Sequence, residues 1–593
     1  MFNRHQSAWM RIASLIMLMS VSVSCTWSLA DFNQNTNTST PTVIPGAVTT
    51  LTPVALAEIT FTTVIPAVLN PGESLTIGIL DEVTGLGLNP VFYAMTAIDD
   101  LHFTVKLPFT MNSVIKYRYY RQGTVSAIED DYSGKPVRYR LFQVTGPAGT
   151  DDIVSSWSDT EFSGGYGKID GVVIDKVTNK PIPNIMVSAG GQNTLTDSLG
   201  QYIINGLPAG THLVSAYALD GAYSSFQQGA SVAVGLVTTA PIQLDPVPFV
   251  NVTFKVSVPT DTVPGAPVRI AGNLLQLGNT FADLQGGVST IWSRMPALSA
   301  GEDGRLNITL KLPAGADVRY KYTLGDGFWN AEHAYDESFL VRQLIVPGHD
   351  LTVQDSVSSW QAGKKSAPIL FDVTVPANTP AGETVSIQFK PFGWTEALPM
   401  WSLGNNHWVY KLYGPLNMLG SFSYRYCRSD QCGSADDIAT AGIDSQGRQV
   451  STSLLGENIQ ETVTEWKWWP EAEPGSLVAI PVNARGAGFW AGAELSANYS
   501  PGWLNLLPAA VQNMVGFGSN FLVLTPGWTV ENTSPLNFAP IPGKDALWSD
   551  VLQNVQTVKS QNLNTALYAT PKFLTSAAEF WAKAPRTPEW WNE

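Results

Sequence analysis

The sequence predicts a mainly β protein, built of tandem β-sandwich domains and ending in a truncated α/β segment. Short runs in which apolar and polar residues alternate, such as residues 318–322, are typical of half-buried strands. Glycine and proline number 51 and 39 in a chain of 593 residues and supply the turns between such strands. A threefold internal repeat divides much of the chain into units of about a hundred residues, the size of a small sandwich.

The charge balance excludes several classes of partner. With 34 Lys and Arg against 49 Asp and Glu, the net charge is −15. This balance disfavours nucleic acid and anionic lipid, because phosphate binding needs clustered basic residues. Only six histidines and three cysteines occur, with no CxxC pair and no HExxH motif. We therefore expect neither a metal site nor a cofactor.

Residues 1–25 have the parts of a secretory signal. Arg4 and Arg11 precede an apolar run at 12–23, and small residues follow. The run is shorter than the roughly 20 residues that span a bilayer, so we expect export to the cell surface or beyond it. Residues 21–25 (VSVSC) resemble a bacterial lipoprotein box, which implies lipidation of Cys25 and membrane contact through that anchor alone; an ordinary signal with an incidental cysteine is the alternative.

Residues 26–57 are predicted to be a disordered linker, because their polar, Asn- and Thr-rich composition cannot bury enough apolar surface to fold. Three stretches after it repeat the same anchors and are each expected to be one sandwich: 58–160, 249–362 and 368–470. A strand tyrosine precedes a closing tryptophan by 40, 40 and 42 residues in the pairs Tyr117 and Trp157, Tyr320 and Trp360, and Tyr424 and Trp466. Because every copy keeps them, we expect these to be core residues.

Two cysteines of the third copy are expected to pair. Cys427 and Cys432 flank a short polar turn between strand-like residues. In the oxidising environment outside the cell, a disulfide that closes this loop is favoured over free thiols. The bond would be structural and carries no catalytic implication.

Residues 168–246 break the repeat. They contain PIP at 181–183, TDSLGQY at 196–202 and GLPAG at 206–210, with Gly200 and Gly210 as turn formers between alternating strands. This block resembles the carboxypeptidase regulatory-like (transthyretin-like) β-sandwich. The resemblance implies a folding or spacing unit without catalytic residues.

The second copy contains four further sequence motifs: VRIAGNLLQLG at 268–278, LP at 312–313, VRYKY at 318–322 and FWN at 328–330. In this order they resemble the family-20 starch-binding module, whose aromatic side chains stack on the glucose rings of an α-glucan. That family has a tryptophan after the Leu-Gly pair, where this chain has Asn279 and Thr280. The resemblance implies that Trp292 replaces it, or that part of the platform is absent, and it gives Trp329 a stacking role.

The candidates for contact with a sugar are Trp292, Trp329, Trp394, Trp401 and Asn273. The four tryptophans have no apolar counterpart in the other copies, so each is either exposed for binding or packed inside. Asn273 either contacts the ligand or caps a turn. An indole suits a pyranose because the C–H groups of the sugar lie flat on it. Each such contact is weak, about 0.5–1.5 kcal/mol by analogy with aromatic pairs. When several modules bind one polymer, avidity raises the overall affinity by a factor of about 10²–10⁴.

Residues 482–593 follow a different pattern. Strands are expected at 488–495, 521–524 and 565–568 and helices at 503–514 and 547–561, with a long loop running to Gly543. Alternating strands and helices predict a parallel sheet. This order resembles the opening of a glycoside hydrolase (β/α)₈ barrel, which needs about 250 residues, so the segment looks truncated.

Hydrolysis of a glycosidic bond requires two carboxylates flanking it. Glu494 ends the first expected strand and Glu531 follows the second. They are weak candidates for that pair, with substrate contact or plain solvation as the alternatives. The resemblance places the catalytic carboxylates on later strands, so we expect no catalysis from this chain.

Together these features predict an exported protein that binds a polysaccharide, an α-glucan, and forms the N-terminal part of a glycoside hydrolase. The alternative is a cell-surface adhesin or scaffold whose sandwiches are spacers without affinity for glycans.

Overall fold

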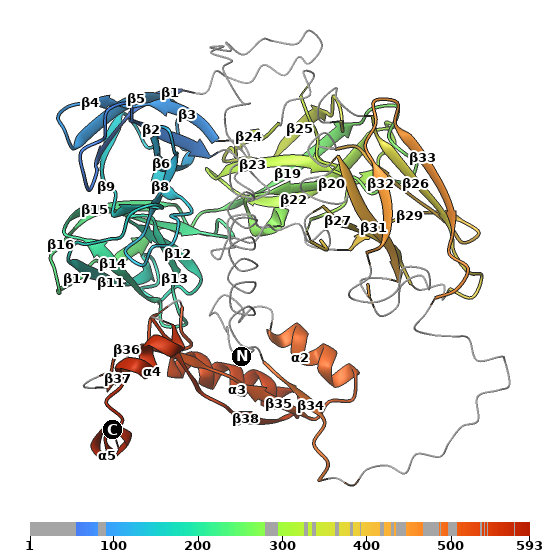
Figure 1. Ribbon diagram of the computed structural model, residues 1–593. Helices are drawn as coiled ribbons and strands as arrows, with labels where there is room; N and C mark the ends of the chain where they lie inside the picture. Colours follow the sequence, from blue (N-terminus) through green and yellow to red (C-terminus); the bar gives the residue numbers. More distant parts are fainter. Residues whose placement is uncertain are drawn as a thin grey trace, which may run out of the picture. The chain divides into compact units, whose positions relative to one another are not determined.

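The computed structural model of the protein describes most of the chain beyond residue 54 (Figure 1). The described residues are 55–80, 90–278, 295–324, 330–334, 340–361, 367–379, 383–391, 393–395, 397–414, 420–428, 432–433, 446–466, 486, 488–495, 507–533, 536–538, 540–542, 544–574 and 576–592. Residues 53–593 form one unit, which holds all the described residues. Within the described ranges, no helix is long and apolar enough to cross a membrane.

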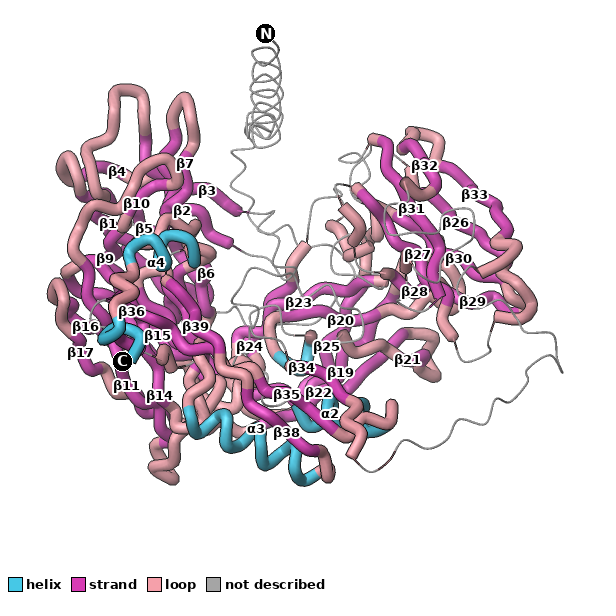
Figure 2. The backbone as a smooth tube through the Cα atoms, turned by 60° about the horizontal axis from the view of Figure 1, so that its bottom comes forward, coloured by secondary structure: helices cyan, strands magenta, loops and turns pink. Residues whose placement is uncertain are grey.

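Strands dominate the described residues, and the helices among them lie in the C-terminal segment apart from one short 3₁₀ turn (Figure 2). The first sandwich contains β1 (Leu56–Val64), β2 (Ser74–Leu80), β3 (Pro90–Ala94), β4 (Thr96–Ala97), β5 (His102–Thr110), β6 (Val114–Gln122), β7 (Ala127–Asp130), β8 (Arg140–Gln143), β9 (Ala148–Ile153) and β10 (Ser156–Trp157). One sheet has the order β4-β5-β1-β9, and the other has the order β10-β7-β6-β2-β3, with β8 also pairing with β6. Alternation along β1 places Ala57, Ile59 and Phe61 in the core.

The second and third sandwiches repeat this plan. The second contains β19 (Phe249–Ser257), β20 (Arg269–Gly272), η2 (Leu275–Leu277), β21 (Ser299–Ala300), β22 (Leu306–Pro313), β23 (Asp317–Thr323), β24 (Arg342–Ile345) and β25 (Leu351–Ser356). The third contains β26 (Ile369–Thr374), β27 (Val385–Lys390), β28 (Leu398–Pro399), β29 (Trp401–Gly404), β30 (His407–Leu412), β31 (Ser421–Arg428), β32 (Arg448–Ser451) and β33 (Glu457–Thr462).

The three copies share one sheet topology, with the orders β4-β5-β1-β9, β21-β22-β19-β25 and β29-β30-β26-β33. In each, the first long strand pairs in parallel with a strand near the end of the copy: β1 with β9, β19 with β25 and β26 with β33. The closing Trp157, Trp360 and Trp466 are 2%, 1% and 4% exposed. The predicted tandem β-sandwiches and their tryptophan anchors are therefore confirmed.

The block at 168–246 is a sandwich of a different order. Its strands are β11 (Tyr166–Asp175), β12 (Ile185–Ala189), β13 (Gln192–Leu195), β14 (Gln201–Pro208), β15 (Gly210–Ala218), β16 (Phe226–Val232), β17 (Val237–Thr239) and β18 (Ile242–Leu244). They form the sheets β14-β11-β17, with β18 also on β11, and β13-β12-β15-β16. Gly200 turns the chain into β14 at φ +69°, where a Cβ would lie 2.5 Å from the Val173 carbonyl oxygen. Only glycine fits this turn without strain.

The C-terminal segment alternates strands and helices. Its elements are β34 (Gly492–Glu494), α2 (Leu507–Gly516), β35 (Phe521–Leu524), β36 (Gly527–Thr533), β37 (Leu536–Phe538), α3 (Trp548–Ser560), β38 (Asn564–Leu567), β39 (Thr570–Phe573), α4 (Ala577–Lys583) and α5 (Pro588–Asn592). β34, β35 and β38 form a parallel sheet, as predicted. The expected long loop after β35 is wrong: β36 and β37 form there, because β36 pairs with β37 and, in parallel, with β39.

Candidate functional site

A buried polar network links the two sheets of the first sandwich. The hydroxyls of Tyr117 and Tyr119 both donate to Asp152 Oδ2, at 2.8 Å each. Arg140 bonds Asp152 Oδ1 at 3.1 Å and Glu129 Oε2 at 2.8 Å. No member of this network is more than 8% exposed. Burial, followed by the charge of Asp152, raises the pKa of both tyrosines well above the usual value, so both remain protonated donors.

The other two sandwiches repeat the network. Asp355 accepts from Tyr320 and Tyr322 at 2.9 and 2.8 Å, and Glu461 accepts from Tyr424 and Tyr426 at 3.1 and 2.7 Å. Arg342 and Arg448 bond these carboxylates in turn. Sequence analysis missed this network, although a signal was present: in each copy the accepting carboxylate stands five residues before the closing tryptophan.

The two tyrosines of each network show which residue of their strand points away from the core of the sandwich. Because alternate residues of a strand point to opposite faces, the residue between the two inward tyrosines points away from the core. That residue is a cation in every copy: Arg118, Lys321 and Arg425. Each lies opposite the same strand position, occupied by Gly78, Ala271 and Gln388 respectively. The repeat therefore places one basic group on the outward face of each second sheet.

In the second sandwich burial and the cation, Lys321, lower the pKa of a histidine, His333. His333 is fully buried, and its backbone pairs with Ser359. Burial, and then the charge of Lys321, lower the pKa of His333 to about 4. The unfolded chain takes up a proton on this histidine below about pH 6.5, whereas the folded chain stays neutral there. Acidification therefore favours the unfolded state.

We expect the free energy of unfolding of the second sandwich to fall by about 2 kcal/mol between pH 7 and pH 5, and His333→Gln to remove most of that dependence. Denaturant titrations at both pH values check this. His349→Gln is the control, because His349 is an exposed histidine of the same sandwich. If the free energy of unfolding of His333→Gln falls as much between pH 7 and pH 5 as that of the unmodified protein, His333 is not the source of the pH dependence.

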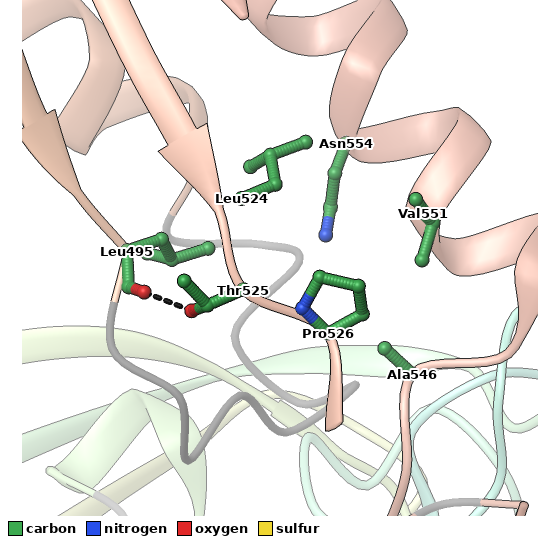
Figure 3. Close-up of a pocket in the computed structure, with 7 residues that line it drawn as sticks. All are labelled: Leu495, Leu524, Thr525, Pro526, Ala546, Val551 and Asn554. Atoms are coloured by element: carbon green, nitrogen blue, oxygen red, sulfur yellow. Dashed lines mark hydrogen bonds between the residues drawn. The ribbon is translucent and has the colours of Figure 1, made fainter. Parts of the chain in front are cut away.

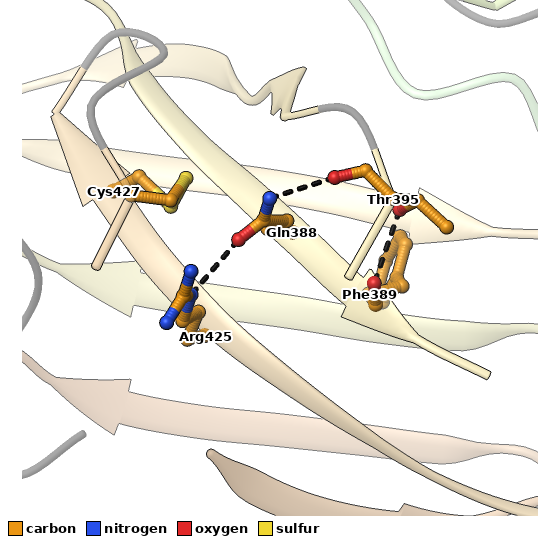
Figure 4. Close-up of a disulfide and its surroundings, with 6 residues drawn as sticks. Gln388, Phe389, Thr395, Arg425 and Cys427 are labelled. Atoms are coloured by element: carbon orange, nitrogen blue, oxygen red, sulfur yellow. Dashed lines mark hydrogen bonds between the residues drawn. A yellow bond between two sulfur atoms is a disulfide. The ribbon is translucent and has the colours of Figure 1, made fainter. Parts of the chain in front are cut away.

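In the third sandwich the outward cation lies against an indole ring. The Arg425 guanidinium carbon is 4.0 Å from the ring centroid of Trp394, and Lys390 Nζ is 5.3 Å from it. Arg425 Nε donates to Gln388 Oε1 at 2.8 Å, and Gln388 Nε2 donates to the Thr395 carbonyl at 2.7 Å (Figure 4). These bonds fix the loop that carries Trp394.

Gly447 also lies against the Trp394 ring. A Cβ at Gly447 would lie 2.8 Å from Trp394 Cη2, so the absence of a side chain leaves room for the indole. Trp394 is half-buried, whereas Arg425 is only 4% exposed. A cation–π contact of this kind contributes about 0.5–2 kcal/mol. The ring is therefore held before any ligand arrives, and a preorganised side chain loses little freedom on binding.

A disulfide lies at the end of the same strand. Cys427 and Cys432 are joined, with their Cα atoms 5.0 Å apart (Figure 4). Cys427 is fully buried on β31, two residues after Arg425. The bond closes the loop that follows this strand.

Replacing Cys427 and Cys432 together by alanine is expected to lower the stability of the third sandwich by about 2 kcal/mol, because the open loop gains entropy in the unfolded chain. Denaturant unfolding, monitored by tryptophan fluorescence, measures the change. A reducing agent should produce the same loss in the unmodified protein and none in the double variant. Equal stability of all samples would contradict the prediction.

Two of the predicted sugar-contacting residues are buried instead. Trp401 is 4% exposed, and its ring centroid lies 5.2 Å from that of Tyr410, inside the sandwich. Asn273 is 1% exposed; its Nδ2 donates to the Asp317 carbonyl and its Oδ1 accepts from the Arg319 amide. Asn273 thus extends the sheet beyond β20. Trp401 therefore takes the packed role, and Asn273 the hydrogen-bonded structural role, that the sequence left open as the alternative to ligand contact.

Three predicted residues, Cys25, Trp292 and Trp329, lie outside the described residues. Of the predicted tryptophans, the described residues therefore bring only Trp394 to an outward face. Arg425, Lys390 and Gln388 around it were missed by sequence analysis. The repeated pattern of a cation between two tyrosines could have identified Arg425.

The two candidate carboxylates of the C-terminal segment belong to different strands. Glu494 is exposed at the end of β34, and Glu531 belongs to β36. A small hollow, partly open to solvent, lies at the carboxyl ends of β34 and β35 (Figure 3). It is lined by Leu495, Leu524, Thr525, Pro526, Ala546, Val551 and Asn554. Among the described residues that line it there is no carboxylate, whereas glycoside hydrolysis needs a pair.

Comparison with known proteins identifies one block of the chain. The carboxypeptidase regulatory-like domain family matches residues 168–245. This match confirms the resemblance predicted for that sandwich, and it covers no other part of the chain.

An α-amylase from Niallia circulans is 30% identical over 216 residues, which are 35% of this chain and 15% of the α-amylase. The chain thus spans a small part of that relative. Among solved structures, the Bacillus anthracis TIE protein aligns over 70% of this chain and 75% of its own at 13% identity, with a TM-score of 0.14. A Hypocrea jecorina family-15 glucoamylase aligns over 20% of each chain at 25% identity, with a TM-score of 0.15.

Proposed function

We propose that the protein is an exported polysaccharide-binding protein whose ligand is an α-glucan, and that its parent is a glycoside hydrolase. The observation that carries the proposal is Trp394, a half-buried indole that Arg425 and Gly447 hold on the outward face of the third sandwich. The sequence similarity to an α-amylase supports the same class of ligand. The predicted secretory signal and the disulfide support export.

The chemistry of this site suits a neutral sugar polymer. A pyranose ring presents a flat patch of C–H groups that can lie on the indole, while Lys390, 5.3 Å from the ring centroid, can donate to hydroxyls at the rim. The binding energy of one such site is small. Attachment of several sites to one chain raises the strength of binding to a polymer by about 10²–10⁴.

Electrophoresis of the full chain in native gels that contain soluble starch tests the proposal. We expect starch to retard the protein, and cellulose derivatives or chitin oligomers to leave its mobility unchanged. Equal mobility with and without all three glycans would overturn the proposal and favour a spacer or adhesin role.

A further inference from the structure

We propose that the first sandwich carries a second α-glucan-binding surface, centred on Phe92 of β3. This inference rests on the proposed function, since it assigns the same class of ligand to another module. It also requires that Arg118 lies close enough to an exposed aromatic ring to contact the same sugar.

Phe92 lies on the outward face of the edge strand β3. It pairs with Gly78 of β2, which in turn pairs with Arg118 of β6, so the three share one face. Its neighbours Val91 and Tyr93 pair with Ile79 and Ile77 and point to the other face. Phe92 is 36% exposed. A large apolar ring thus stands at an accessible sheet edge.

The ring belongs to a cluster of aromatic and basic groups. Phe92 packs edge-on against Tyr120, with ring centroids 5.0 Å apart and planes at 82°. The Arg118 guanidinium carbon lies 5.0 Å from the Tyr120 centroid, and Arg118 Nε donates to the Tyr120 hydroxyl at 2.5 Å. The Arg118 guanidinium therefore lies near the exposed ring, in reach of sugar hydroxyls, whereas Tyr120, which is 4% exposed, packs behind Phe92.

Gly78 makes this close packing possible. A Cβ at this position would lie 2.5 Å from Tyr120 Cε2 and 3.4 Å from Phe92 Cε1. Glycine inside a strand weakens it by about 0.5–1 kcal/mol relative to alanine. The strand thus carries a residue that costs stability and gives space to the two rings. This is the same role that Gly447 has beside Trp394.

The two surfaces have the same composition, an aromatic ring next to an outward arginine at the repeated strand position. On separate sandwiches of one chain, they would engage one polymer together. Such bivalency predicts that the loss of either surface weakens binding to starch far more than the small energy of one stacking contact.

Native gels with graded starch concentrations test this on the full chain. We expect Phe92→Ala, and Phe92→Leu, which keeps apolar packing on Tyr120, each to raise the apparent dissociation constant at least tenfold. Val91→Ala is the matched control, because Val91 is 50% exposed on the same strand but faces the other way. It should bind as the unmodified chain does.

Unchanged retardation of Phe92→Leu would overturn the second surface, whereas the proposed function would stand if Trp394→Ala still lost binding in the same gels. Failure of the unmodified chain to bind starch would overturn both.

Discussion

Replacing Asp152 by alanine is expected to lower the free energy of unfolding of the first sandwich by about 3–5 kcal/mol. The substitution removes the acceptor of the Tyr117 and Tyr119 hydroxyls and one of the two carboxylates that neutralise Arg140, which is 3% exposed. Hydrogen–deuterium exchange of peptides from β6 and β9 in the full chain measures the local loss of stability.

Asp151 supplies the control for this prediction. It precedes Asp152 on β9 but is exposed, so Asp151→Ala should leave exchange within about 0.5 kcal/mol of the unmodified protein. Asp152→Asn, which keeps an acceptor for the phenols but not the charge, should fall between the two. If Asp151→Ala and Asp152→Ala destabilise the sandwich equally, the network is not what holds the sheets together.

Replacing Trp394 by alanine is expected to weaken binding to soluble starch at least tenfold, because the substitution removes the stacking surface and the avidity that depends on it. Affinity electrophoresis measures the change, and circular dichroism confirms that the fold is kept. Trp490→Ala serves as the control, since Trp490 is 63% exposed but lies in the C-terminal segment. Starch binding that survives in Trp394→Ala would exclude this indole from the site.

A subtler variant separates the position of the ring from its presence. Gly447→Ala places a Cβ 2.8 Å from Trp394 Cη2 and 2.7 Å from the Tyr424 carbonyl, and should displace the indole. Gly420 of the same sandwich has a similar positive φ, +63° against +71°, but open space around its Cβ position. Gly420→Ala therefore carries the same backbone strain without the contact. Starch binding should fall in Gly447→Ala and persist in Gly420→Ala.

The fold was predictable because the repeat encodes it. Tyrosine and tryptophan anchors recur at nearly fixed spacing, and the structure places Trp157, Trp360 and Trp466 in equivalent cores. The parallel strands of the C-terminal segment also follow from alternating periodicity. The strand β36 was missed because its pairing partner β39 lies far along the chain, and local pattern does not reveal such pairing.

The candidate site was predictable only in part. Trp394 and Trp401 look alike in the sequence, since neither has an apolar counterpart in the other copies. Their exposure differs because Trp401 joins the edge strand β29 with its ring against Tyr410, whereas Trp394 lies in a loop before it. A shift of one residue along a strand exchanges the two faces, so burial cannot be read without the register. Arg425, by contrast, follows from the register that its flanking tyrosines impose.

A crystal structure of the full chain with maltoheptaose tests the central claim most directly. We expect a glucose ring stacked on the Trp394 indole, with Lys390 bonded to its hydroxyls. A maltoheptaose bound only away from Trp394, or a bare indole in crystals soaked to saturation, would contradict the assignment of this site.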